Sequence, residues 1–86
     1  MATIPELKTL KRGDYIEVSK DYCFYFKVLD VTKNGFYLSH PFSKGSKPRK
    51  GKWFTRFYPE AARYDHSCWN GIRADNPKAK GIESSN

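Results

Sequence analysis

Asp14–His40 reads DYIEVSKDYCFYFKVLDVTKNGFYLSH and carries the densest strand signals in the chain. Tyr15–Val18 alternates polar and apolar residues, as a half-buried strand does. Tyr22–Val31 is rich in aromatic and β-branched residues, which suit a pleated and partly buried surface. Asn34-Gly35 favours a tight type I′ turn, and Phe36–Ser39 follows it as a returning strand. The segment therefore predicts an antiparallel meander of three strands.

Weaker strand signals and a long loop follow the meander. Residues 40–52 contain two prolines, two glycines and two serines, which exclude regular structure over most of this segment. Trp53–Tyr58 predicts a fourth strand, and Pro59 ends it. Residues 64–72 predict a short last strand or a second hairpin at Asn70-Gly71. Short strands joined by turns and one long loop indicate a small all-β domain.

The two ends of the chain differ from this middle part. Thr3 and Glu6 have the spacing of a capping box, and Pro5 suits a first helical turn, so the N-terminus predicts a short helical segment. Residues 74–86 are mostly polar, which predicts a flexible C-terminal tail. A chain of 86 residues has the size of one domain, and we expect residues 1–73 to form a single small β-barrel domain.

Leu10–Val18, which reads LKRGDYIEV, resembles the opening strand of SH3-like small barrels, including the KOW- and Tudor-type modules. In these modules a leucine, a basic pair and Gly-Asp precede an alternating strand. Tyr22–Val31 is partly apolar on both sides, as expected of a long bent strand that serves two sheets of a barrel. The expected fold is therefore all-β with minor α: a small five-stranded SH3-like barrel with a short N-terminal helical segment and a long basic loop.

Positive charge is concentrated in the middle third of the chain. The sequence has 16 Lys and Arg against 9 Asp and Glu, which gives a net charge of +7. Residues 31–59 contain seven of these cations and no acid, whereas the remaining nine cations are balanced by nine acids. This asymmetry predicts a polyanionic partner, with nucleic acid as the first candidate.

We expect binding through the 44–56 basic loop and the aromatic residues beside it. Cations on a loop suit phosphate contacts better than base readout, so little sequence specificity is expected. DNA is favoured over RNA because no RNA-specific motif is present. Flat rings beside the loop would stack on unpaired bases. The expected nucleic-acid-binding residues are Lys33, Lys44, Lys47, Arg49, Lys50, Lys52, Arg56, Tyr37 and Trp53.

A protein-interaction module is the alternative. Tudor-type barrels hold peptides in aromatic cages, which bind cations through the faces of the rings. The residues available for such a cage are Tyr22, Tyr25, Phe36, Tyr37 and Trp53. A variant of this alternative is a small inhibitor whose basic face docks on an acidic protein surface.

Signals for a metal site or for catalysis are weak. Tetrahedral zinc needs four ligands, and the spacing of the cysteines and histidines includes no Cys-x-x-Cys or His-x-x-x-His pair. All the cysteines and histidines of the chain are Cys23, His40, His66 and Cys68. The run Asp65–Cys68 is consecutive, whereas catalytic triads are assembled in space by the fold. We expect no metal, no cofactor and no enzymatic activity.

The sequence also bears on compartment. It contains no apolar run long enough to cross a bilayer and no signal-peptide pattern at the N-terminus. The two cysteines are expected to be reduced thiols, as in cytosolic proteins. We therefore expect a cytoplasmic protein that does not bind membranes.

Overall fold

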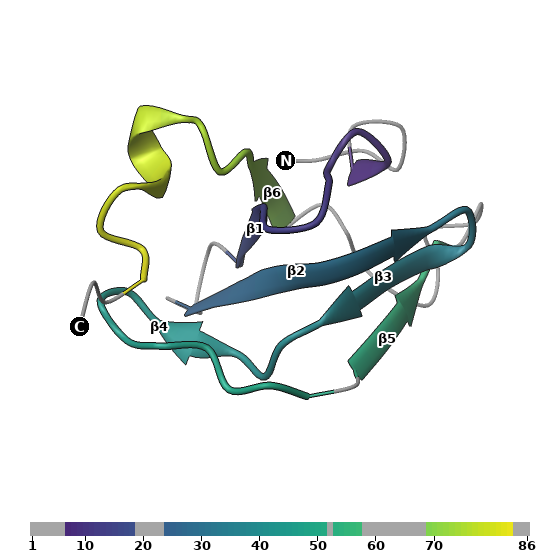
Figure 1. Ribbon diagram of the computed structural model, residues 1–86, viewed down its shortest axis with the longest axis horizontal. Coiled ribbons are helices and arrows are strands. Elements are labelled where there is room, and N and C mark those ends of the chain that lie inside the picture. The colour runs from purple at the N-terminus through teal and green to yellow at the C-terminus, as the bar shows by residue number, and fades with distance from the viewer. Residues whose placement is uncertain (1–6, 19–23, 52, 58–68, 84–86) are drawn as a thin grey trace.

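A computed structural model describes residues 7–18, 24–51, 53–57 and 69–83 (Figure 1). The described elements are β1 (Tyr15–Val18), β2 (Phe24–Thr32), β3 (Gly35–Leu38), β4 (Phe42–Ser43), β5 (Trp53–Arg56), β6 (Trp69–Ile72) and the short 3-10 helix η2 (Pro77–Ala79). The strand pairings are antiparallel, in the order β5-β3-β2-β1-β6, and β4 pairs with β2 outside this path. The prediction of an all-β fold is confirmed.

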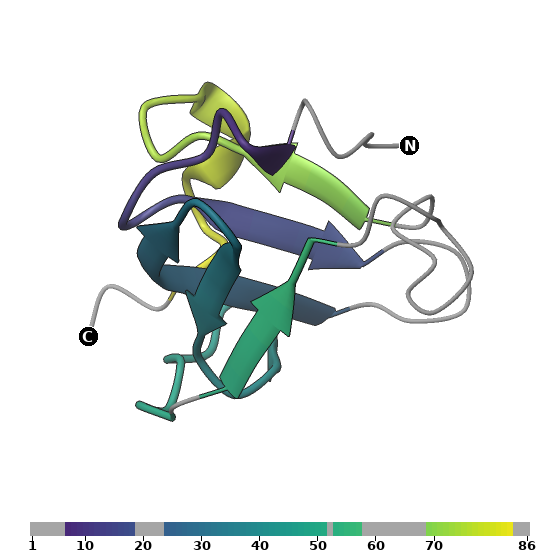
Figure 2. The ribbon, with the colours of Figure 1, turned by 90° about the vertical axis from the view of Figure 1, so that its right-hand side faces the viewer.

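The sheet is open, so the prediction of a closed five-stranded barrel is wrong. Closure would require hydrogen bonds between β5 and β6, but these two strands end the order on opposite sides and no pairing of described strands joins them (Figure 2). The long strand β2 does serve two sheets, as predicted: its first half pairs with β1 and its second half with β3. A register shift between Val28 and Asp30 separates the two halves and bends the strand.

The described part of the N-terminal segment forms turns instead of the predicted helical segment. The Leu10 N–H donates to the Leu7 carbonyl at 3.1 Å, and the Asp14 N–H donates to the Lys11 carbonyl at 3.0 Å. The Asp14 carboxylate accepts from the Lys11 N–H at 2.7 Å and from the Ala74 N–H at 2.7 Å. Leu7 is the one helical residue in the described part of this segment, and these bonds close the turns that follow it. Residues 1–6 lie outside the described residues.

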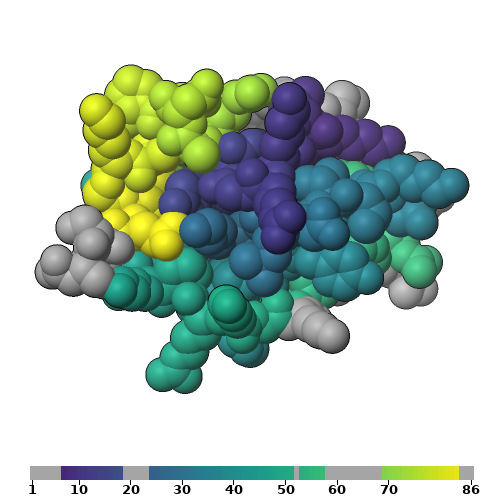
Figure 3. Space-filling model, in the orientation of Figure 1, coloured from purple at the N-terminus to yellow at the C-terminus, as the bar shows by residue number. Residues whose placement is uncertain are grey.

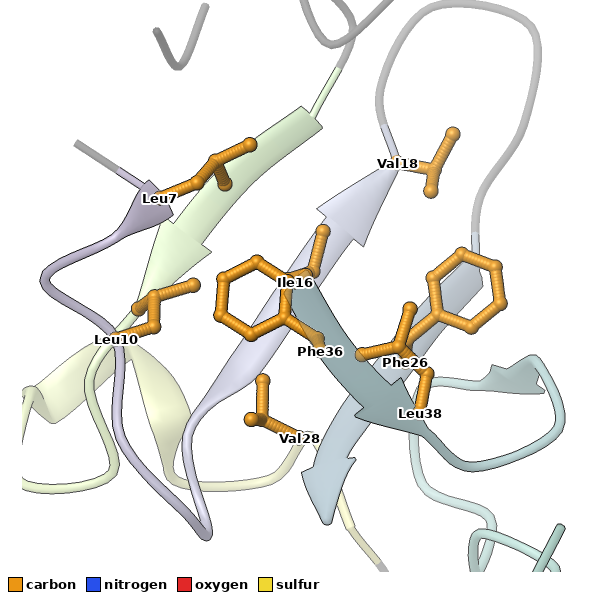
Figure 4. Packing of buried hydrophobic residues seen from close by; sticks show 8 residues of the cluster. All are labelled: Leu7, Leu10, Ile16, Val18, Phe26, Val28, Phe36 and Leu38. Atoms are coloured by element: carbon orange, nitrogen blue, oxygen red, sulfur yellow. The ribbon is translucent and has the colours of Figure 1, made fainter. Parts of the chain in front are cut away.

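The main core lies against the inner face of the sheet (Figure 4). Its side chains come from the N-terminal turns and from β1, β2 and β3, so the core links all parts of the meander. The cluster contains Leu7, Leu10, Ile16, Val18, Phe26, Val28, Phe36 and Leu38. Two of these eight side chains are aromatic: Phe26 and Phe36 are both buried, and the Phe36 ring meets the Phe57 ring at 4.9 Å between centroids.

A second core lies on the other face of the sheet, beneath the C-terminal segment. It contains Tyr15, Tyr25, Phe42, Ile72 and Ile82. Ile82 is 1% exposed, and the Ile82 carbonyl accepts from the Gly45 N–H at 2.8 Å. The described part of the expected tail, residues 74–83, is therefore anchored on the sheet through Ile82 and Ala79, although most of its other residues are exposed. We call the face formed by Tyr15, Tyr25, Phe42 and Ile72 the covered face.

The hairpin between β2 and β3 forms as predicted, but for a different local reason. Its two turn residues are Lys33 and Asn34, and Thr32 pairs with Gly35. The Thr32 Oγ1 accepts from the Asn34 N–H at 3.1 Å and from the Gly35 N–H at 3.2 Å. Gly35 is the first residue of β3, where a Cβ atom would lie 2.0 Å from the Thr55 carbonyl oxygen. The glycine therefore permits the close approach of β5.

Candidate nucleic-acid interface

The basic loop, residues 44–51, is fixed to the rest of the molecule near both ends. At its start, Ser46 forms a parallel β-bridge with Glu83. Near its end, the His40 N–H donates to the Arg49 carbonyl at 3.1 Å. Gly51 packs so closely on the His40 ring that a Cβ atom there would lie 2.8 Å from it. Figure 3 shows part of this loop projecting from the lower edge of the molecule, below the C-terminal segment.

A hollow of about 220 Å³ lies between the loop and the sheet. We call it the cationic hollow; its lining residues are Lys27, Leu29, Ser39, Lys47, Pro48, Arg49, Lys50 and Glu83. Four of these side chains are cationic and one is a carboxylate, so the lining carries a net positive charge. Ser39 holds the floor in place, because its Oγ accepts from the Lys27 N–H at 2.9 Å and donates to the His40 carbonyl at 3.0 Å.

Glu83 is the carboxylate of this hollow, and it is already engaged. Its Oε2 lies 3.0 Å from the Lys27 Nζ, and it accepts a hydrogen bond from the Tyr15 hydroxyl. Partial burial alone would raise the pKa of Glu83, but the hydrogen bonds from Tyr15 and Lys27 and the charges of Lys27 and Lys47 lower it overall. The pKa of Tyr15 rises to about 12 because of burial and because its hydroxyl bonds this carboxylate. Glu83 is therefore a half-buried anchor for the C-terminal segment.

The other described cations near the loop form no ion pair with a described carboxylate. Within residues 7–18, 24–51, 53–57 and 69–83, the ion pairs join Lys27 to Glu83 and Arg73 to Asp75. The expected binding residues that are exposed and form no ion pair in this part of the chain are Lys33, Lys44, Lys47, Arg49, Lys50 and Arg56. An unpaired surface cation remains free to bind an external anion, which would release its counterions.

A second hollow, of about 340 Å³, lies on the other side of Leu29. We call it the ring hollow; Leu29, Asp30, Tyr37 and Gly51 line it. Tyr37 is 39% exposed, and its ring is supported by Phe54 at 4.9 Å between centroids. Tyr37 and Phe54 are direct partners across β3 and β5, so they share one face of the sheet. We call the surface formed by Leu29, Tyr37 and Phe54 the open face.

Trp53 lies at the sheet edge on β5. It is 45% exposed, and its ring meets the edge of the buried Phe26 ring at 5.4 Å between centroids. Trp53 pairs with Leu38, so it projects from the core side of the sheet, opposite to Tyr37. The two exposed aromatics predicted for the site are therefore on different faces of the sheet.

The structure brings together some of the predicted binding residues and separates others. Lys47, Arg49 and Lys50 line the cationic hollow, and Tyr37 lines the adjoining ring hollow. Lys33 lies in the β2–β3 turn, at the end of the molecule away from the C-terminal segment (Figure 1). Arg56 lies opposite Gly35 near that same turn. Lys44 is in the turn after β4 and lines neither hollow, and Lys52 lies outside the described residues.

Sequence reasoning missed Lys27, Leu29 and Glu83. Lys27 is the one charged residue within the aromatic run of residues 22–29, and this was the available signal. The pairing that brings Lys27 beside Ser39 depends on the β2–β3 register, which composition does not reveal. Glu83 is distant in sequence and belongs to a segment that was expected to be a tail.

The other sequence-based candidates are not assembled by the described residues. Tyr25 and Phe36 are buried in opposite cores, so they do not form an aromatic cage with Tyr37. No group of three His, Cys, Asp or Glu in the described ranges could hold a metal ion. Of the cysteines and histidines only His40 is described; Cys23, His66 and Cys68 lie outside, as does the rest of the run 65–68. No helix among the described residues is long and apolar enough to cross a membrane.

The site thus combines a cationic hollow with an adjoining aromatic one, an arrangement suited to a ligand that is both anionic and flat. Comparison with family models, with curated proteins and with solved structures found no significant match. What the chain binds must therefore be inferred from its own residues.

Proposed function

We propose that the protein binds nucleic acid, with DNA as the expected ligand, through the cationic hollow and the exposed aromatic residue beside it. The observation that carries this proposal is the lining of the hollow: Lys47, Arg49 and Lys50 converge on it, and none of the three forms an ion pair with a carboxylate of the described residues. Lys27 adds a fourth positive charge, although Glu83 pairs with it. Converging cations of this kind neutralise phosphates and displace the counterions condensed on them.

Binding of this kind reads the sugar-phosphate backbone more than the base sequence. In the described part of the chain η2 has three residues, which is too short to enter a major groove as a recognition helix. The cationic side chains lie on a loop above a sheet, where they position a strand without reading base edges. We therefore expect affinity that varies little with base sequence and falls steeply with salt.

A titration at several salt concentrations tests the proposal. Fluorescence anisotropy with labelled DNA is measured from low to physiological salt, and an RNA of the same sequence is compared because the 2′-hydroxyl distinguishes the two. If three phosphates are neutralised on a duplex, affinity falls roughly 40-fold between 50 and 200 mM salt. Lys50→Ala and Arg49→Ala should each reduce the salt slope by about 1.

The matched control is Lys78→Ala, which removes an exposed cation from η2 outside the hollow. It should leave the salt slope nearly unchanged. Absence of binding at low salt to DNA and RNA alike would remove the proposal, and equal effects of Lys78→Ala and Lys50→Ala would show that the hollow is not the site.

Trp53 favours a second candidate function, docking on an acidic protein surface. Tryptophan is enriched among interface hot spots, and Trp53 is 45% exposed. Its strand, β5, is also an edge strand of the described sheet. If this candidate is correct, a stoichiometric protein partner is retained from nuclease-treated lysate and lost with Trp53→Ala, while DNA affinity is unaffected by that change.

A further inference from the structure

We propose that the ligand is a single strand, and that one of its nucleotides lies across Leu29 with its phosphate in the cationic hollow and its base on Tyr37. This inference rests on the proposed nucleic-acid binding and makes it more specific. Leu29 lines both hollows, so the two are adjacent and open on one surface of the sheet. A nucleotide likewise joins an anionic group to a flat apolar one.

The sizes of the hollows support division of one ligand between them. Pockets that enclose a whole small ligand have volumes of roughly 300–1,000 Å³. The cationic hollow, at about 220 Å³, lies below that range, and the ring hollow, at about 340 Å³, is near its lower limit. The cationic hollow therefore fits one part of a nucleotide better than a whole one.

Charge fixes which part enters which hollow. Lys27, Lys47, Arg49 and Lys50 line the first against the single carboxylate of Glu83. The second has Asp30 as its charged lining residue. The Asp30 Oδ1 accepts from the Val31 N–H at 2.9 Å, and no described cation pairs with this carboxylate. Since Asp30 repels phosphate, the ring hollow selects the uncharged base.

Tyr37 is placed to receive a base. Its ring is 39% exposed and is supported by Phe54, so stacking would require little loss of side-chain freedom. Every base has a flat face, which makes such stacking tolerant of sequence. In a duplex those faces are occupied by neighbouring base pairs, so only an unpaired base can reach Tyr37. The ring hollow thus distinguishes single strands from duplexes.

The experiment compares three ligands by fluorescence anisotropy: a short single strand, its duplex, and a strand of the same length in which abasic sites replace the bases. We expect Tyr37→Ala to weaken binding of the base-bearing strand by about 5- to 100-fold. Tyr37→Phe, which keeps the ring, should bind like the unchanged protein. With the abasic strand, Tyr37→Ala should have no effect, whereas Lys50→Ala should weaken binding of both strands.

A measurement on the unchanged protein keeps the inference testable if Tyr37→Ala folds poorly. In NMR titrations, the Tyr37 ring and Leu29 methyl signals should shift with the base-bearing strand and stay in place with the abasic one. Suppose that Lys50→Ala weakens binding, that the Tyr37 and Leu29 signals shift equally with the base-bearing and the abasic strand, and that Tyr37→Ala changes the affinity for both strands equally. The stacking inference is then overturned, and nucleic-acid binding stands. If no ligand binds at low salt, both fail.

Discussion

The two halves of the sheet both carry aromatic residues on their outer faces, but these residues differ in how far they are exposed. On the covered face, Tyr15 and Tyr25 are buried, because the C-terminal segment places Ile82 over them. On the open face, Tyr37 is 39% exposed and Phe54 is half-buried. The two faces have similar residue types, so the position of one short segment decides which rings become core and which remain at the surface.

This difference separates stability from binding. The covered face holds its apolar residues in place, and its two tyrosine hydroxyls donate to carboxylates, Tyr15 to Glu83 and Tyr25 to Glu17. The open face adjoins unpaired cations and two hollows. If the separation is real, substitutions on the covered face should affect mainly folding, and those on the open face mainly ligand affinity. The following experiments test that expectation.

The largest effect is expected from Ile82→Ala on the covered face. Removing a fully buried aliphatic side chain leaves a cavity over Tyr15, so the free energy of unfolding should fall by about 2–5 kcal/mol. The measurement is urea denaturation followed by tryptophan fluorescence. Leu29→Ala is the matched change on the open face; because Leu29 is half-buried, its cost should be about 1 kcal/mol. Equal losses for the two variants would contradict the distinction between the faces.

A smaller loss of stability is expected from Gly35→Ala, which disturbs only the half of the sheet that contains β3 and β5. The added Cβ would lie 2.0 Å from the Thr55 carbonyl oxygen, so β5 must move away from β3 at a cost of about 1–3 kcal/mol. Hydrogen exchange should show lost protection of backbone amides in β3 and β5 before those of β1 and β6. Lys33→Ala, at the adjacent turn, is the control for a change in the same hairpin without a collision. Uniform loss of protection over both halves would mean that the sheet opens as one unit.

Alkaline pH should lower the stability of the protein through Tyr15 on the covered face. The pKa of Tyr15 is raised to about 12, whereas tyrosine in the unfolded chain ionises near its ordinary value of 10.0. Between these values the unfolded state has lost a proton that the folded state keeps, so the free energy of unfolding falls as pH rises from 10 to 12. Tyr15→Phe should flatten this decline in urea denaturation midpoints.

At acid pH the free energy of unfolding should fall as pH decreases, and the hydrogen bond between Tyr15 and Glu83 is again involved. Because the pKa of Glu83 is lowered overall, its stabilising contribution is present above the ordinary value of 4.5 and is lost as pH falls through the folded value. Glu83→Gln should remove that part of the acid dependence. Tyr37→Phe is the control on the open face, since the Tyr37 hydroxyl forms no described hydrogen bond to Glu83. A control that changed the alkaline or the acid dependence as much as Tyr15→Phe or Glu83→Gln would show that the anchor is not the cause.

Local sequence signals predicted the meander well. The alternation in β1 and the aromatic run of β2 depend on neighbours within a few positions. The hairpin was also expected, although its turn lies at Lys33-Asn34 and the prediction placed it at Asn34-Gly35. Ile82 is different, because it is the one large apolar residue of residues 74–86, and only the long-range requirement to cover Tyr15 and Tyr25 makes it a core residue. Composition therefore predicted a tail where the fold places a cover.

The candidate site also combines residues that the local sequence predicted with residues that only long-range pairing brings together. The charge run identified Lys47, Arg49 and Lys50, because cations crowded into one loop are visible in any linear reading. It also selected Lys33, which the fold places at the distant hairpin, and it passed over Lys27 and Leu29, which the β2–β3 register brings beneath the loop. Which cations act together depends on strand pairing, and pairing between distant segments is what a linear pattern does not specify.

The smallest effect is expected from Lys33→Ala on DNA binding. Lys33 and Lys50 are both exposed lysines without an ion pair in the described residues, so the two substitutions remove the same charge. Only Lys50 lines the cationic hollow, and the turn that holds Lys33 lies away from it along the molecule. Lys50→Ala should lower the salt slope by about 1, whereas Lys33→Ala should change it by less than about 0.3. Equal slopes would mean that DNA responds to net charge wherever it lies, and the geometry of the hollow would then have no part in binding.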